Sequence, residues 1–142
     1  MTKKLYFEFI FLIFLGALTS LSLPPINYLT VNFITLSLFF AFLVKRSKQK
    51  KNRKLYFLHG WLFGFGYFIS NLYWISISLT FDESFKFLIP LALVFIPAFL
   101  ALFYGLISFL FLVYKPKKII SSFFFFSIIY GLVEFIRGSI LT

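Results

Sequence analysis

Five long apolar blocks, separated by short charged or proline-containing stretches, make up almost the whole chain. Their approximate bounds are residues 5–23, 28–44, 55–79, 87–114 and 119–141. The hydrocarbon core of a bilayer is about 30 Å thick, and a helix needs about 20 apolar residues to cross it. The pattern therefore predicts an all-α, polytopic membrane protein with about five transmembrane helices, rather than a soluble fold.

The boundaries of these blocks carry helix-ending signals. Pro24 and Pro25 close the first block, because proline lacks a backbone N–H and restricts the residue before it. A basic run over residues 45–54 closes the second block. Pro90 and Pro97 lie inside the fourth block, whose excess length fits a kinked or tilted helix better than a straight one.

The composition indicates the same class of protein. Of the 142 residues, 61% are hydrophobic and 13% are charged, and the mean hydropathy is +0.99. The chain has no cysteine, which excludes a disulfide framework, a thiolate metal site and a cysteine nucleophile within these residues. It also has no Ser/His/Asp arrangement and no Gly-rich phosphate loop. The residues by themselves therefore predict no catalytic group, no metal site and no cofactor.

The net charge of +10 is concentrated beside the apolar blocks. The clusters are Lys3 with Lys4, the basic run over residues 45–54, and the trio Lys115, Lys117 and Lys118. Such clusters set topology and attract anionic lipid headgroups, so we expect no nucleic-acid partner. With the N-terminus cytoplasmic and the C-terminus outside, 12 of the 14 Lys and Arg residues fall on the cytoplasmic side, and we predict this orientation.

The first apolar block has a second interpretation. Lys3 and Lys4, the apolar stretch after them and the small residues near 17–22 also resemble a secretory signal peptide. Glu8 inside the block and the lack of a clean small-x-small site before Pro24 favour a membrane helix that is kept. The remaining helices have the same predicted orientation under either interpretation.

The third block contains small residues that suit close helix packing. Gly60 and Gly64 form a small-xxx-small pair, and Asn71 lies about two helical turns after Gly64 on much the same face. We expect these glycines to pack against another helix of the same chain, with a dimer face as the alternative. His59 is expected at the headgroup level near the cytoplasmic start of this helix, rather than in a metal site.

Two carboxylates lie inside apolar blocks. Glu8 follows Lys4 by one helical turn, so we expect these two to pair. Glu134 and Arg137 are three residues apart on one helical face, in a segment where an unpaired charge is costly. The second pair is interpreted either as a structural ion pair near the outer interface or as part of a functional site.

Three stretches of the sequence resemble bacterial apolipoprotein N-acyltransferases. The third block contains Gly-Trp-Leu-Phe-Gly from Gly60 and Leu-Tyr-Trp-Ile from Leu72, like a membrane helix of that family. Leu23-Pro-Pro-Ile-Asn27 resembles the turn after the family's first helix, and Glu134-Phe-Ile-Arg-Gly138 resembles its Glu-x-x-Arg-Gly motif. The three stretches occur in the family's order. Ser139 departs from the pattern, because an aromatic residue often follows Arg-Gly in the family.

The resemblance implies a role in lipoprotein maturation at the bacterial cytoplasmic (inner) membrane. Members of the family transfer an acyl chain from a phospholipid to the α-amino group of the lipid-modified N-terminal cysteine of a lipoprotein. Phospholipid and lipoprotein substrates are then the expected partners, beside the membrane lipids. The family's nitrilase-like catalytic domain, with its Glu, Lys and Cys residues, is not within these residues, so we expect the chain alone to be inactive.

The candidates for contact with lipid or substrate follow from the family motifs and from their place in the helices. They are Asn71, Tyr73, Trp74, Glu134 and Arg137. For Tyr73 and Trp74, an interfacial aromatic belt is the alternative.

Two other functions stay open from the residues. A small membrane scaffold or interaction subunit would use the Gly60 and Gly64 face to bind a partner. A transport component would use the charged pair in the last block and the prolines of the fourth, although the chain shows no inverted repeat.

Overall fold

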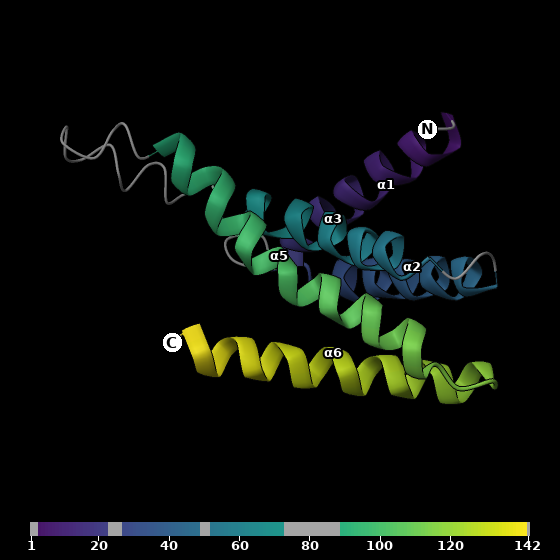
Figure 1. Ribbon diagram of the computed structural model, residues 1–142. Coiled ribbons are helices and arrows are strands. Elements are labelled where there is room, and N and C mark those ends of the chain that lie inside the picture. Colours follow the sequence, from purple (N-terminus) through teal and green to yellow (C-terminus); the bar gives the residue numbers. More distant parts are fainter. Residues whose placement is uncertain (1–2, 23–26, 49–51, 73–88, 142) are drawn as a thin grey trace.

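The computed structural model describes residues 3–22, 27–48, 52–72 and 89–141, and this part of the chain is helical without any strand (Figure 1). The elements are α1 Lys3–Thr19 with a short 3-10 helix η1 Ser20–Ser22, α2 Leu29–Ser47, α3 Arg53–Asn71, α5 Ile89–Tyr114 and α6 Ile119–Leu141. The predicted all-α class is confirmed. Tyr73 and Trp74 lie outside the described residues.

Four segments of the described chain are long and apolar enough to cross a membrane. They are Lys3–Ser22, Leu29–Ser47, Ile89–Tyr114 and Ile119–Ile140. Helix α3 is not among them, since Arg53, Lys54, His59 and Asn71 make it more polar, and residues 73–79 of its predicted span lie outside the described part. The chain is therefore a multi-pass membrane protein. Four such helices lie within the described residues, whereas the apolar pattern predicts about five.

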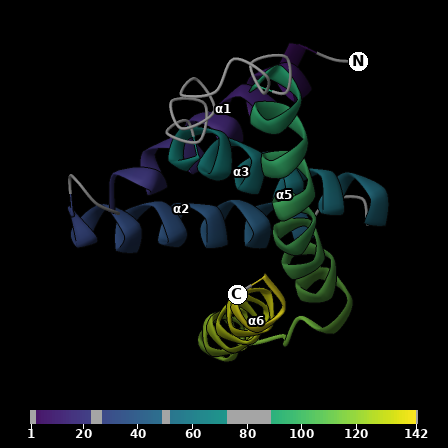
Figure 2. The same cartoon turned by 90° about the vertical axis from the view of Figure 1, so that its left-hand side faces the viewer.

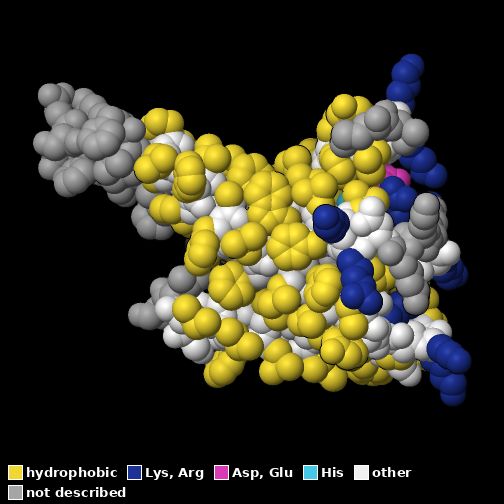
Figure 3. All heavy atoms as spheres, viewed as in Figure 1, with side chains coloured by type: hydrophobic (Ala, Val, Ile, Leu, Met, Phe, Trp, Pro, Cys, Tyr) yellow, Lys and Arg dark blue, Asp and Glu magenta, His cyan; other side chains and the backbone are white. Residues whose placement is uncertain are grey.

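The surface of these helices suits lipid rather than water. Large apolar side chains point outward from all four candidate spans, among them Phe7 of α1, Phe33 of α2, Phe95 of α5 and Phe135 of α6. Apolar side chains also cover the face shown in Figure 3. A soluble protein rarely exposes contiguous apolar patches of this extent.

Helix α3 lies between α1 and α5 (Figures 1 and 2), and glycines bring its backbone against both. On the α1 side, a Cβ added to Gly16 of α1 would lie 2.0 Å from the Phe63 carbonyl oxygen of α3. In the same interface, a Cβ on Gly66 of α3 would lie 2.1 Å from the Ile13 carbonyl oxygen of α1. Only glycine fits at such a distance, so α1 and α3 are in backbone contact.

The other face of α3 packs on α5 in the same way. A Cβ on Gly60 would lie 2.2 Å from the Tyr104 carbonyl oxygen, and one on Gly64 would lie 2.7 Å from the Tyr104 Cβ. Farther along the interface, Trp61 Nε1 donates a 3.0 Å hydrogen bond to the Ala98 carbonyl oxygen. The α3–α5 interface therefore combines close backbone approach with a hydrogen bond from an indole group.

Basic side chains gather at one end of the bundle, at the right of Figure 3. Helices α1, α3 and α6 begin at this end, and α2 and α5 finish there. Lys115, which directly follows α5, connects the end of α5 to the end of α2, because its Nζ donates a 2.6 Å hydrogen bond to Ser47 Oγ. Partial burial, together with the neighbouring charge of Lys48, lowers the pKa of Lys115. We call this the basic end of the bundle.

One expectation at the basic end is wrong. Glu8 forms its ion pair with Arg46 of α2, a partner that helical spacing within α1 does not reveal. His59, expected at the headgroup level, is fully buried within the bundle, and its ring packs edge-on against Phe42 at 5.1 Å and Phe9 at 6.1 Å between centroids. The reason is the central place of α3, whose neighbours cover the face that carries His59.

Candidate functional site

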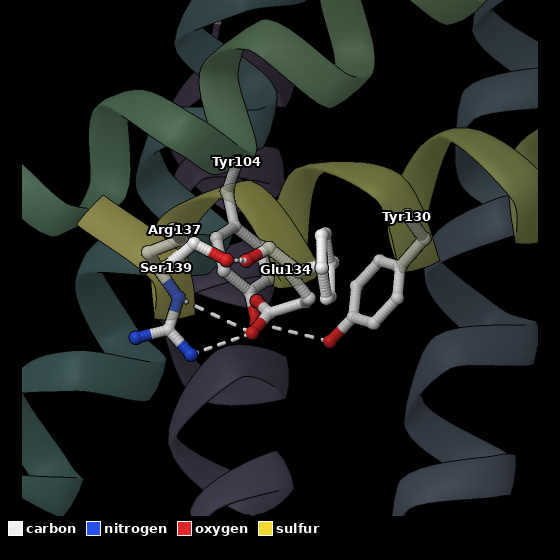
Figure 4. A network of polar contacts seen from close by, with 6 residues as sticks. Tyr104, Tyr130, Glu134, Arg137 and Ser139 are labelled. Carbon is white, nitrogen blue, oxygen red and sulfur yellow. Dashed lines mark hydrogen bonds and ion pairs between the residues drawn. The ribbon is translucent and has the colours of Figure 1, made fainter. Parts of the chain in front are cut away.

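Glu134 and Arg137 form an ion pair on α6 at the end of the bundle away from the basic end (Figure 4). Glu134 Oε2 accepts hydrogen bonds from Arg137 Nη2 at 2.6 Å and from Arg137 Nε at 3.2 Å. The two side chains are 25% and 24% exposed, respectively. Helical spacing alone brings them together, because residues three apart lie on one face. Glu134 Oε1 is buried and accepts no hydrogen bond within the described residues.

Arg137 also reaches α3. Its guanidinium carbon lies 5.3 Å from the centroid of the Phe68 ring, within the range of a cation–π contact. Phe68 is buried, three residues before the end of α3 at Asn71. The ion pair on α6 is therefore placed near the carboxyl end of α3, which is where Asn71 lies.

A pair of tyrosines lies beside the ion pair. The hydroxyl groups of Tyr104 on α5 and Tyr130 on α6 are 2.9 Å apart and share a hydrogen bond (Figure 4). Tyr104 is fully buried, and its ring also contacts Tyr67 and Phe68 of α3, with centroids 5.9 and 5.5 Å away. The tyrosines link three helices around the place where Glu134 and Arg137 pair.

The structure brings some of the sequence candidates together and separates others. Glu134 and Arg137 are paired, Asn71 ends the neighbouring helix, and Tyr73 and Trp74 fall outside the described residues. Gly60 and Gly64 lie apart from the ion pair, in contact with α5. Because α5 covers that glycine face, it is not free to bind the partner that a scaffold function would require.

Sequence reasoning missed Tyr104, Tyr130 and Phe68 as parts of the site. Tyr130 precedes Glu134 by four residues, so one turn of helix places the two on the same face, and this spacing could have identified it. No comparable signal points to Tyr104 or Phe68, since each reaches the site from another helix. Ser139, where the family pattern often has an aromatic residue, donates its hydroxyl to the Phe135 carbonyl oxygen of its own helix.

An apolar pocket of about 270 Å³ lies between α2 and α6 and reaches the tyrosine pair. Phe33 and Leu36 form its α2 wall, and Phe123, Phe126 and Tyr130 form its α6 wall. Tyr130 thus borders the pocket with its ring and touches the polar cluster with its hydroxyl. The arrangement suits a molecule with an apolar chain and a polar end, as a lipid has.

The described side chains at this end are suited to binding a polar group. They offer a guanidinium, two phenols and a carboxylate, and the described residues contain no group of His, Cys, Asp and Glu side chains that could hold a metal ion. A covalent acyl-transfer step needs a strong nucleophile with an adjacent base. Glu134 is the one carboxylate among these described side chains and is paired with Arg137, so they show no activated nucleophile beside a free base.

Comparisons with known proteins give the chain its family. The N-terminal domain of apolipoprotein N-acyltransferase matches residues 15–142. The apolipoprotein N-acyltransferase of Rhodopseudomonas palustris is 36% identical over 133 residues, which are 89% of this chain and 24% of that protein. Those of Rhizobium rhizogenes and Brucella melitensis are 38% and 36% identical over 96 residues, which are 63% of this chain and 18% of each relative.

The chain thus spans about a quarter or less of the length of these relatives. No solved structure gives a significant match. The family match includes α2, α3, α5 and α6 and contains both partners of the Glu134–Arg137 pair. The chain belongs to the apolipoprotein N-acyltransferase family, to whose N-terminal domain it corresponds.

Proposed function

We propose that this chain is the N-terminal membrane part of an apolipoprotein N-acyltransferase of the bacterial inner membrane. The whole enzyme would transfer an acyl chain from a phospholipid to the N-terminal amine of a lipid-modified lipoprotein. The observation that carries the proposal is the family match, which runs through residues 15–142 and is joined by a relative that aligns with 89% of the chain. The Glu134–Arg137 pair supports it, since it lies within the matched segment.

Within that enzyme, the role of this part is to hold lipid and to support the catalytic groups. The pocket between α2 and α6 takes an acyl chain, and Tyr130 at its wall leads to the polar cluster around Glu134 and Arg137. Asn71, which ends α3 near this cluster, contacts the lipid or lipoprotein substrate in this proposal. Tyr73 and Trp74, which lie outside the described residues, remain candidates for the same contact by their place in the sequence. The buried Glu134 Oε1 is an acceptor for a donor on the substrate.

The 142-residue chain by itself performs no acyl transfer under this proposal. Transfer through a covalent intermediate needs an activated nucleophile, a base and oxyanion donors held in one site. The sequence contains no cysteine, and its one histidine, His59, is buried near the basic end.

A growth assay tests the proposal in cells whose own apolipoprotein N-acyltransferase gene is repressed. In one chimera, residues 1–142 replace the matching segment of the Rhodopseudomonas palustris protein. In a control chimera, the Rhizobium rhizogenes segment replaces it at the same junction. Both chimeras should support growth if they accumulate equally, whereas the 142-residue chain alone should not. If only the control chimera supports growth, the proposed function is wrong.

A further inference from the structure

The basic end of the bundle has far more positive than negative charge. Helix and loop ends contribute Lys and Arg side chains there from α1, α2, α3 and the α5–α6 connection. Among the described residues, the only carboxylates are Glu8 and Glu134, and Glu134 lies near the opposite end of α6. Glu8 alone therefore balances this charge within the described chain, and further compensation has to come from outside these residues.

A pocket of about 280 Å³ opens among these charges, between the start of α1 and the end of α2. Its polar wall consists of Lys4, Glu8, Lys45 and Arg46. Glu8 and Arg46 form an ion pair and are 13% and 18% exposed. Their charges offset one another, so Lys4 and Lys45, whose side chains are exposed, give the pocket a net positive charge.

The rest of the pocket is apolar and aromatic. Phe7 and Phe11 of α1 and Phe42 of α2 line it, and the rings of Phe11 and Phe42 are 6.3 Å apart. Phe7 is 73% exposed and continues onto the lipid-facing surface of α1. The pocket therefore joins a cationic rim to a surface suited to hydrocarbon.

We propose that this pocket binds an anionic phospholipid, with its phosphate between Lys4 and Lys45 and its acyl chains along Phe7 and Phe42. Two ammonium groups attract a headgroup with a net negative charge, and they attract a zwitterionic headgroup less. The aromatic wall favours a lipid over a free phosphate ion, which has no apolar part to bury. The site lies at the opposite end from Glu134 and Arg137, so the inference does not rest on the proposed acyl transfer.

The test measures lipid binding by the purified 142-residue chain with spin-labelled phosphatidylglycerol and phosphatidylcholine. The wild type should show a motionally restricted fraction that is larger for phosphatidylglycerol. The variant Lys4→Gln with Lys45→Gln should lower the affinity for phosphatidylglycerol about tenfold, since each lysine near an anionic lipid contributes appreciably. The matched control, Lys117→Gln with Lys118→Gln, removes the same charge from exposed positions outside the pocket and should change the affinity less than about twofold.

Each alternative gives a different result. Equal losses in the two double variants would mean a general attraction of anionic lipid to the basic end, and the pocket assignment would be wrong. Equal binding of the two lipids by the wild type would also overturn the proposal. Displacement of phosphatidylglycerol by inorganic phosphate at matched ionic strength would show a phosphate site without lipid selectivity, which likewise contradicts it. Circular dichroism of each variant verifies that the helices are intact.

Discussion

Arg137 of α6 lies over the Phe68 ring of α3, 5.3 Å from guanidinium carbon to ring centroid, while the same guanidinium binds Glu134. One side chain thus takes part in an ion pair within its own helix and in a contact between two helices. Helix α6 packs mainly on α5. The contact between Arg137 and Phe68 connects α6 directly to α3 as well. It also fixes the guanidinium near the carboxyl end of α3.

Replacement of Phe68 by leucine should therefore lower the free energy of unfolding by more than the loss of ring volume alone would. The variant loses the cation–π contact, worth about 0.5–2 kcal/mol, and part of the packing around Tyr104. The measurement is thermal unfolding in detergent. Phe95→Leu is the matched control, since Phe95 is 67% exposed on α5 and should change the midpoint little. A shift of equal size in both variants would contradict the role given to Phe68.

The ion pair on α6 predicts a rescue by double substitution. Arg137→Leu leaves Glu134 charged and partly buried without its partner, and should cost about 2 kcal/mol or more in folding. Adding Glu134→Leu removes the stranded charge and should recover more than half of this loss. The yield of folded protein in membranes, assayed by size-exclusion chromatography, measures the effect. A double variant that accumulates no better than Arg137→Leu would show that the pairing does not govern folding.

Replacement of glycine by alanine should have a different effect on stability in α3 than in α6. Gly60→Ala forces a methyl group toward the Tyr104 backbone, which cannot move like a flexible side chain, and should destabilise the chain by about 1–3 kcal/mol. Gly131→Ala is the control, since its Cβ would meet no heavy atom within 4 Å, and the substitution should be neutral or stabilising through helix propensity. Unfolding midpoints compare the two, and similar midpoints would contradict the α3–α5 interface described above.

The basic end predicts the orientation of the chain in the membrane. Lys and Arg near helix ends favour the cytoplasmic side, so a reporter fused at Lys50 should report the cytoplasm and one fused after Thr142 the outside. Each position is tested with two reporters, an enzyme that is active only outside the cytoplasm and a fluorophore that is active only inside it. The two reporters give opposite signals at the same position, so each is a control for the other. A cytoplasmic C-terminus would overturn this orientation.

Local sequence signals predicted the helices and one contact of the site. Apolar blocks gave the helical class because length and hydropathy determine which segments can cross a bilayer. The Glu134–Arg137 pair follows from a spacing of three residues, which is a property of a single helix. In the same way, the small residues at Gly60 and Gly64 indicated a face for close packing before its partner helix was known.

The remaining contacts depend on which helices become neighbours. Lys4 has the right spacing for Glu8, yet Arg46 of α2 reaches that carboxylate in the folded chain. His59 is buried because Phe9 of α1 and Phe42 of α2 pack on its ring, an arrangement that no periodicity in α3 specifies. Tyr104 and Phe68 join the site from separate helices for the same reason. Tertiary packing, and not helix formation, was the step that the sequence left undetermined.

Mass spectrometry of an acyl acceptor shows whether these residues serve as the membrane part of an N-acyltransferase. Purified chimera, in which residues 1–142 replace the matching segment of the Rhodopseudomonas palustris relative, is incubated in lipid with a phospholipid donor and a diacylated lipoprotein peptide. The peptide should carry an added acyl chain on its N-terminus after incubation with the chimera, and it should be unchanged after incubation with the 142-residue chain alone. An unchanged peptide with the folded chimera, while the Rhizobium rhizogenes control chimera acylates it, would contradict the assignment of this chain to an acyltransferase.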